Sequence, residues 1–168
     1  EDGKVAGGAG LDAANAVSLQ ADGKIVAAGI SYAGSLSSFM VARYNTDGSL
    51  DTSFGGDGKV FTNDKNLFSA ADLAIQVDGK IVVVGQAGVH NNNFALARYN
   101  SDGSLDLTFD TNGVVTTDVS ATIRSDTANA VVLQADGQIV VAGSAWIGSS
   151  NDFAMVRYNT DGSLDPSL

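Results

Sequence analysis

The sequence predicts an all-β fold built from three similar four-stranded units, and three observations carry this prediction. The stretch RYNTDGSLD at residues 43–51 returns as RYNSDGSLD at 98–106 and as RYNTDGSLD at 157–165. An Asp-Gly pair between two apolar runs also occurs once per unit, beginning at Asp22, Asp78 and Asp136, which are 56 and 58 residues apart. No segment has a sustained apolar period of about 3.6 residues, the pattern of an amphipathic helix. An internal repeat of this length indicates an array of similar β units.

The composition is that of one globular domain with many tight turns. The 168 residues are 44% hydrophobic and 17% charged, with 20 glycines and a single proline. No apolar run approaches the roughly 20 residues that span a bilayer, so we expect no membrane insertion. The net charge of −10 repels nucleic acid, and the absence of cysteine excludes disulfides and thiolate metal sites.

Each unit opens with two strands joined by the Asp-Gly pair. Runs of alternating apolar residues at 16–20, 72–76 and 130–134 predict the first strand. Asp-Gly between apolar runs is a strong hairpin signal, and we expect a type I′ turn in which both Asp22 and Gly23 have positive φ. The apolar stretches KIVAAG, KIVVVG and QIVVAG then predict a second strand that is buried on both faces.

The second half of each unit contains a variable segment, a third strand, the copied turn and a short fourth strand. We expect loops at the variable segments, which read ISYAGSLSS, QAGVHNNN and SAWIGSSND. In the third strand, Phe39, Val41 and Arg43 share one face because side chains alternate along a strand. After the copied turn, residues 59–62 and 114–117 predict the fourth strand of the first two units.

Four antiparallel strands per unit, at a period near 57 residues, describe a β-propeller blade. A blade cannot bury both of its faces alone, so neighbouring blades stack on it. A β-solenoid is the alternative, but its coils are shorter and lack repeated Asp-Gly hairpins. We expect a single repeat domain over residues 1–168, with repeats at 11–66, 67–121 and 122–168.

The repeated pattern resembles a known family. The residues Q-x-D-G-K-I-V-x-x-G, followed by F-x-x-x-R-Y-N-x-D-G-S-L-D-x-x-F-G, are similar to the delta-60 repeat, a bacterial β-propeller family whose function is not established. The pattern is not uniform: Asp72 stands where the other repeats have Ala16 and Ala130, and Gln138 replaces the lysine. The resemblance implies a secreted or cell-envelope location in a bacterium, often many repeats in one chain, and no catalytic residues.

The two ends of the sequence carry matching parts of one blade. Residues 1–7, EDGKVAG, resemble GDGKVFT at 56–62, so we expect residues 1–10 to form a strand that completes a neighbouring blade. The third repeat ends in SLDPSL, where its own fourth strand would begin. Three blades are too few to close a propeller. We therefore expect a head-to-tail homo-oligomer, most simply two chains that form six blades. The alternative is a fragment of a longer repeat array.

The copied turn has two interpretations. Its Asn, Asp, Ser and Asp side chains alternate along the chain, and Ca²⁺ prefers several oxygen ligands from a short, sharply turned loop. The pattern partly resembles the start of an EF-hand loop, but its glycine falls one place late and no glutamate follows at the twelfth position. We favour Asx-turns that hydrogen-bond their own backbone, and we expect no cofactor. The Ca²⁺ alternative falls on Asp47, Asp51, Asp102, Asp106, Asp161 and Asp165.

An arginine stands beside the copied turn in every unit, at Arg43, Arg98 and Arg157. An anion-binding role is one interpretation. We favour a structural role, in which the guanidinium forks onto Asp51 or its equivalents and ties adjacent turns or blades together.

The variable segments are the candidates for recognition, because loops on a rigid scaffold carry binding sites. The candidate ligand-binding residues are Tyr32, His90, Asn92, Trp146 and Asn151. Aromatic rings beside amides suit carbohydrate, and a surface protein is the other expected partner; in the alternative view Tyr32 and Trp146 only cap the core.

The chain has one histidine, no cysteine, no Gly-x-Ser-x-Gly elbow and no P-loop. We therefore expect a non-catalytic scaffold or interaction module, with a ligand-binding propeller second and an enzyme such as a glycosidase last.

Overall fold

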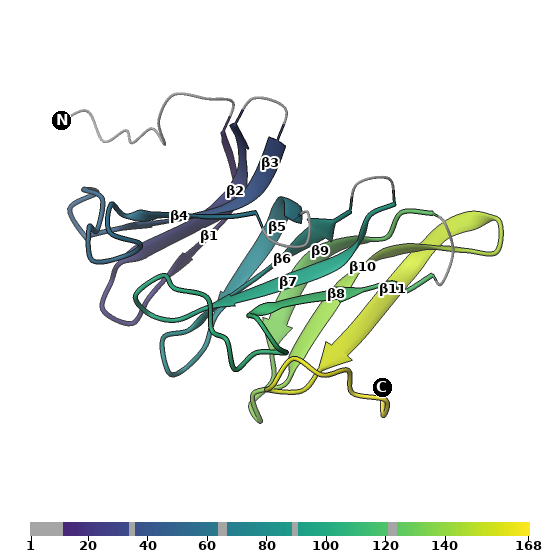
Figure 1. Cartoon of the computed structure of the whole chain (residues 1–168). Coiled ribbons are helices and arrows are strands. Elements are labelled where there is room, and N and C mark those ends of the chain that lie inside the picture. The colour runs from purple at the N-terminus through teal and green to yellow at the C-terminus, as the bar shows by residue number, and fades with distance from the viewer. Residues whose placement is uncertain (1–11, 34–35, 64–66, 89–90, 121–123) are drawn as a thin grey trace.

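The computed structural model describes residues 12–33, 36–63, 67–88, 91–120 and 124–168, and they form eleven strands in three antiparallel sheets (Figure 1). We call the sheets blades 1, 2 and 3. Blade 1 contains β1 (Ala13–Leu19), β2 (Ile25–Ala33), β3 (Leu36–Tyr44) and β4 (Lys59–Thr62). Blade 2 contains β5 (Leu67–Ile75), β6 (Ile81–Ala87), β7 (Asn93–Tyr99) and β8 (Val114–Thr117). Blade 3 contains β9 (Thr127–Leu133), β10 (Ile139–Ile147) and β11 (Ser150–Tyr158).

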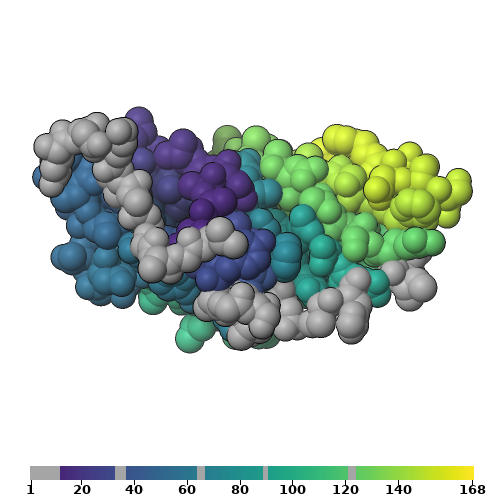
Figure 2. All heavy atoms as spheres, turned by 90° about the horizontal axis from the view of Figure 1, so that it is seen from above, coloured from purple at the N-terminus to yellow at the C-terminus, as the bar shows by residue number. Residues whose placement is uncertain are grey.

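Each blade is a meander in which consecutive strands pair. The first strands of neighbouring blades contact one another, β1 with β5 and β5 with β9, so they form the inner edge. The fourth strand lies at the opposite edge of its sheet. The three blades follow one another in a row, from purple to yellow, as an open arc rather than a closed ring (Figures 1 and 2). The predicted all-β fold of propeller blades is therefore confirmed.

A glycine in the second strand of each blade allows the inner edge to pack closely. A Cβ atom at Gly29 would collide with the carbonyl oxygen of Ala13, and the same holds for Gly85 and Gly143 in the other blades. The pairing of the first two strands shifts its register at this place in all three blades. Only glycine leaves room for such a bulge, because any side chain would occupy the space of the neighbouring backbone.

The core lies between the blades. One cluster of buried side chains joins blades 1 and 2, and its largest members are Phe39, Phe54 and Tyr99. A second cluster joins blades 2 and 3, with Phe94, Phe109 and Tyr158. Full burial of such a side chain contributes roughly 2–3 kcal/mol, so stacking of blades is the main apolar source of stability.

The prediction that every second strand is buried on both faces is correct only for blade 2. In β6, all residues from Ile81 to Val84 are buried. In blade 1, Ile25 and Ala27 are only half-buried, and in blade 3 the same is true of Val140 and Ala142. The apolar runs are alike in the three blades, but burial depends on a neighbour on each side, which only the middle blade has within this chain.

The Asp-Gly turns differ from the predicted type I′ turn. Gly23, Gly79 and Gly137 have φ values of 82°, 84° and 88°, whereas Asp110 is the one non-glycine residue with positive φ among those described. The turn is a three-residue loop closed by bonds from Gln20 N to the Lys24 carbonyl (2.8 Å) and from Gly23 N to the Gln20 carbonyl (2.9 Å). A type I turn followed by one left-handed residue closes such a loop, so the aspartate needs no positive φ.

The variable segments, predicted to be loops, are mostly strand in blades 1 and 3. The β2–β3 pairing continues to Ala33 and Leu36, and the β10–β11 pairing continues to Ile147 and Ser150. In blade 2, β6 ends at Ala87 and β7 begins at Asn93, and the described residues between them, Gly88, Asn91 and Asn92, belong to neither strand. The glycine and serine content of these segments resembles that of loops, so their composition did not indicate strands, although Ala145 packs in the core between blades 2 and 3.

The predicted fourth strands at 59–62 and 114–117 coincide with β4 and β8. The strand expected in residues 1–10 lies outside the described residues. Within the described part of the chain, no helix has the length and hydropathy to span a membrane.

Candidate functional site at the blade junctions

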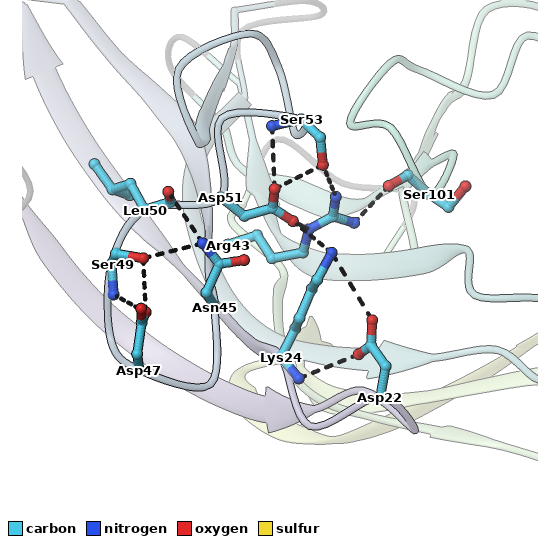
Figure 3. Close-up of polar contacts among 10 residues, drawn as sticks. All are labelled: Asp22, Lys24, Arg43, Asn45, Asp47, Ser49, Leu50, Asp51, Ser53 and Ser101. Carbon is cyan, nitrogen blue, oxygen red and sulfur yellow. Dashed lines mark hydrogen bonds and ion pairs between the residues drawn. The ribbon is translucent and has the colours of Figure 1, made fainter.

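The copied turn is held by its own backbone and side chains (Figure 3). Asn45 N donates to the Ser49 carbonyl (2.8 Å), and Gly48 N donates to the Asn45 carbonyl (3.0 Å). The Asp47 carboxylate accepts hydrogen bonds from the Ser49 hydroxyl (2.6 Å) and the Ser49 amide (2.9 Å). These bonds, the hydroxyl first, lower the pKa of Asp47. The predicted Asx-turn is confirmed, and the other two copies repeat it.

A buried carboxylate lies directly behind the turn (Figure 3). One oxygen of Asp51 accepts from Arg43 Nε (2.8 Å) and from Lys24 Nζ (2.9 Å). The other accepts from the Ser53 hydroxyl (2.6 Å) and amide (3.1 Å). The Ser53 hydroxyl and Lys24 hold the pKa of Asp51 well below its usual range, although burial acts in the opposite direction. Asp51 therefore stays charged, and the predicted arginine–aspartate pair is confirmed.

The same cluster recurs in the other blades with one substitution. In blade 2, Asp106 accepts from Arg98 Nε (2.7 Å) and Lys80 Nζ (2.9 Å). In blade 3, Asp165 accepts from Arg157 Nε (2.7 Å) and from Gln138 Nε2 (2.8 Å). The glutamine that departs from the repeat pattern thus donates to the carboxylate in place of lysine.

The arginine also reaches the copied turn of the next blade. Arg43 Nη1 donates to the Ser101 carbonyl of blade 2, and Arg98 Nη1 donates to the Thr160 carbonyl of blade 3. A backbone bond lies beside each of these contacts, from Gly55 N to the Asp102 carbonyl (2.8 Å) and from Asp110 N to the Asp161 carbonyl (2.6 Å). The copied turn is therefore the acceptor for the preceding blade.

A phenylalanine completes each junction. The Phe54 ring lies under the Arg43 guanidinium, 4.7 Å from its centroid, and Phe109 lies 4.4 Å from Arg98 in the same way. Both rings are fully buried. A Cβ atom at Gly103 would lie 3.2 Å from the Phe54 ring, so the ring packs directly onto the glycine of the next copied turn. The repeat pattern contains these phenylalanines at the end of S-L-D-x-x-F in the first two repeats, but the sequence did not predict their contact with the arginine.

A tyrosine–threonine pair also joins each two neighbouring blades, from the fourth strand of one blade to the third strand of the next. The hydroxyls of Thr62 and Tyr99 lie 2.7 Å apart across the first junction. Tyr158 donates to Thr117 (2.8 Å) across the second. Burial raises the pKa of Tyr99 and raises that of Tyr158 to about 12, so both phenols stay neutral at physiological pH.

Asp72, which departs from the alanine of the other repeats, also crosses a junction. Its carboxylate accepts from the amide of Val131 in blade 3 (2.9 Å) and from the Leu73 amide beside it (2.8 Å). The substitution therefore adds a polar contact at the inner edge of the second junction.

The Ca²⁺ alternative remains a prediction. Asp51, Asp106 and Asp165 already pair with cationic or amide donors, as described above. Asp47, Asp102 and Asp161 each bind the serine two residues on. Among the described residues, no group of three or more His, Cys, Asp or Glu side chains has an arrangement that could hold a metal ion.

The four candidate ligand-binding residues that the structure describes lie at the opposite ends of the strands from the copied turns, and two of these four lie together. Trp146 and Asn151 are direct cross-strand partners in the β10–β11 hairpin, and the Arg124 guanidinium lies 4.8 Å from the Trp146 ring. Tyr32 is 39% exposed on blade 1. Asn92 donates to Gln86 (2.6 Å) within blade 2. His90 lies outside the described residues.

Arg124 carried no signal in the sequence, because the segment between blades 2 and 3 has no counterpart pattern elsewhere in the chain.

Three stacked antiparallel blades whose first strands share an inner edge define a β-propeller repeat protein. A family model described as domain of unknown function (DUF5122) beta-propeller matches the chain three times, at residues 20–54, 76–109 and 134–168. These matches cover more than half of the chain, which therefore belongs to this family. Each match runs from the first turn of a blade through the arginine and the copied turn to Phe54, Phe109 or Leu168. A search of curated proteins finds no match.

Proposed function

We propose that the protein is a non-catalytic scaffold or interaction module that assembles head to tail with other copies. The observation that carries this proposal is the outer face of blade 3. Phe153, Met155 and Leu168 are 75%, 46% and 55% exposed. Their equivalents in blade 2, Phe94, Leu96 and Phe109, are fully buried against blade 3.

The outer face of blade 1 has the complementary character. Val17 is 69% exposed, whereas its equivalents Leu73 and Val131 are 7% and 6% exposed because a preceding blade covers them. The two ends of the molecule, which are opposite in Figure 2, are therefore the two halves of one blade–blade interface. Contact between such unlike surfaces is heterologous, and it closes into a ring when the rotation permits. Two chains would supply six blades.

The free edge of blade 3 supports the same assembly. In blades 1 and 2 the third strand pairs with a fourth strand, but the described part of blade 3 has the order β11-β10-β9. Residues 2–5 read DGKV, as do residues 57–60 at the start of β4. We propose that residues 1–10 of one copy pair with β11 of the next, since an open strand edge is a template for strand addition. We also propose that the repeats are of the delta-60 type. The protein would then be secreted or lie in the cell envelope of a bacterium.

The test is the assembly of a variant with a charge on the outer face of blade 3. Phe153→Asp should weaken self-association at least about tenfold, because buried aromatic residues dominate such interfaces. Sedimentation velocity over a concentration series measures the effect. Leu107→Asp is the matched control, since Leu107 is 68% exposed and lies in the loop after the copied turn of blade 2. Equal association of both variants and wild type would contradict the proposal.

A second candidate function is ligand binding, with carbohydrate or a surface protein as the partner. The observation that favours it is the Trp146–Asn151 pair with Arg124 over the indole ring. The chain has one tryptophan, so its fluorescence reports on this hairpin alone. Binding to a glycan panel should change the fluorescence and should be lost in Asn151→Ala, with Tyr32→Ala as the comparison on blade 1. Unchanged fluorescence across the panel would contradict this function.

A further inference from the structure

The two junctions within the chain share one polar design. The preceding blade supplies an arginine and an apolar side chain at the end of SLDxxF; these are Arg43 with Phe54, and Arg98 with Phe109. The following blade supplies the copied turn, with two carbonyls that accept hydrogen bonds and a glycine under the apolar side chain. We call the first set the anchor residues and the second the acceptor turn.

Blade 1 has an acceptor turn, residues 45–49, without anchor residues on it. Its fold is the same as in the other blades, with Gly48 at φ 86°. A Cβ atom at Gly48 would meet nothing within 4 Å, whereas one at Gly162 would lie 3.0 Å from the Phe109 ring. Within the described residues, the carbonyls of Thr46 and Asp47 accept no hydrogen bond, although those of their equivalents in blades 2 and 3 do.

Blade 3 has anchor residues without an acceptor turn. Its Arg157 is held by Asp165 at 2.7 Å, as Arg43 and Arg98 are held by their own aspartates. The Arg157 side chain is 19% exposed, against 6% for each of the other two. Leu168 follows at the position of Phe54 and Phe109, and it is 55% exposed. Both residues are therefore placed as in a junction but face solvent.

The charges of the two surfaces are complementary. Asp102 and Asp161 each lie close enough to the arginine of the preceding blade for its charge to add to the serine hydrogen bonds that lower their pKa. The Asp47 pKa is lowered first by the Ser49 hydroxyl and then by backbone hydrogen bonds, and no described arginine adds its charge there. Among the residues that the structure describes, the acidic turn of blade 1 thus lacks the arginine that both equivalent turns have.

We infer that the acceptor turn of blade 1 binds Arg157 and Leu168 of a second copy of this chain. Arg157 Nη1 donates to the Thr46 carbonyl, and Leu168 packs onto Gly48, as Arg98 and Phe109 do at Thr160 and Gly162. This inference rests on the proposed head-to-tail assembly and adds its register: the polar contact fixes which strands of the two end blades face each other. The apolar faces alone permit sliding, because dispersion and burial have little directional preference.

The test uses one variant on each surface. Leu168→Asp places a carboxylate against Asp47 of the partner, and Gly48→Asn fills the space above the glycine while asparagine tolerates positive φ. Each variant alone should associate at least about tenfold more weakly than wild type, since an exposed leucine that becomes buried contributes on that order. Gly56→Asn is the matched control, because Gly56 has φ 92° and also has nothing within 4 Å of an added Cβ. It should associate like wild type.

Mixing the two variants gives the sharper result. A mixed pair contains one interface with both changes and one interface with neither, so the mixture should associate more tightly than either variant alone. Restoration of this kind requires a head-to-tail contact between these two surfaces. A monomeric wild type would overturn the assembly itself. Association of wild type and both variants with equal affinity would leave the assembly in place and overturn this inference.

Discussion

Blades 2 and 3 have nearly the same residues at equivalent positions, yet their cores differ. Phe94 of blade 2 is fully buried, and Phe153 of blade 3 is 75% exposed. The same contrast separates Phe109 from Leu168. The difference is that blade 2 has a neighbour on both faces, so burial in this fold is a property of the junction and not of the blade. Each blade has two faces, and each face is one side of a junction. A face contributes little to the free energy of unfolding until a neighbouring blade covers it.

The largest expected effect comes from removing the apolar member of a complete junction. Phe109→Ala should lower the free energy of unfolding by about 3–5 kcal/mol, because a fully buried ring leaves a cavity. Leu168→Ala should change it by less than about 0.5 kcal/mol under conditions where the chain is monomeric, since Leu168 is exposed there. Denaturant unfolding of both variants at low concentration measures the contrast. Equal losses of stability in the two variants would contradict the claim that Phe109 is covered by a neighbouring blade whereas Leu168 is not.

A smaller contrast is expected at the glycines of the acceptor turns. Gly103→Ala places a Cβ atom 2.9 Å from the backbone nitrogen of Gly55, which itself bonds the Asp102 carbonyl. This close contact and the cost of a positive φ for alanine should together lower the free energy of unfolding by about 3 kcal/mol. Gly48→Ala has the positive φ but no close contact, so about 1–2 kcal/mol should be lost. Thermal unfolding of the two variants separates the backbone strain, which both have, from the close contact, which only Gly103→Ala has. A larger loss of stability for Gly48→Ala than for Gly103→Ala would contradict the described packing of the junction.

The smallest effect concerns acid stability. The pKa values of Asp51 and Asp106 are lowered in the folded state, so the unfolded chain takes up protons first as the pH falls. The free energy of unfolding should be nearly constant at neutral pH and should decline below about pH 5, as the unfolded carboxylates titrate near 3.9. Asp106→Asn should flatten this decline more than Asp22→Asn, because Asp22 is exposed. Identical dependence of stability on pH in the two variants would show that the buried carboxylate of Asp106 does not govern acid unfolding.

The repeat pattern predicted most of the blade, because turn and strand signals are local. The spacing of Arg43 and Asp51 predicted their pairing, since the turn between them returns the chain beside the arginine. The pattern suggested that the arginine ties adjacent turns or blades together, but it could not supply the partner atoms of any contact between blades. That Arg43 bonds a carbonyl of residue 101, or that Thr62 meets Tyr99, depends on how two sheets stack. The long β10–β11 hairpin was also missed, because exposed strand ends rich in glycine and serine resemble loops in composition.

The most direct test of the account is the solution mass of the wild-type chain. We predict a species of at least twice the 17.1 kDa of one chain at micromolar concentration, with a closed pair of six blades as the simplest form. Sedimentation equilibrium that fits a single 17.1 kDa species over the accessible concentration range would contradict the claim that another copy covers the open face of blade 3.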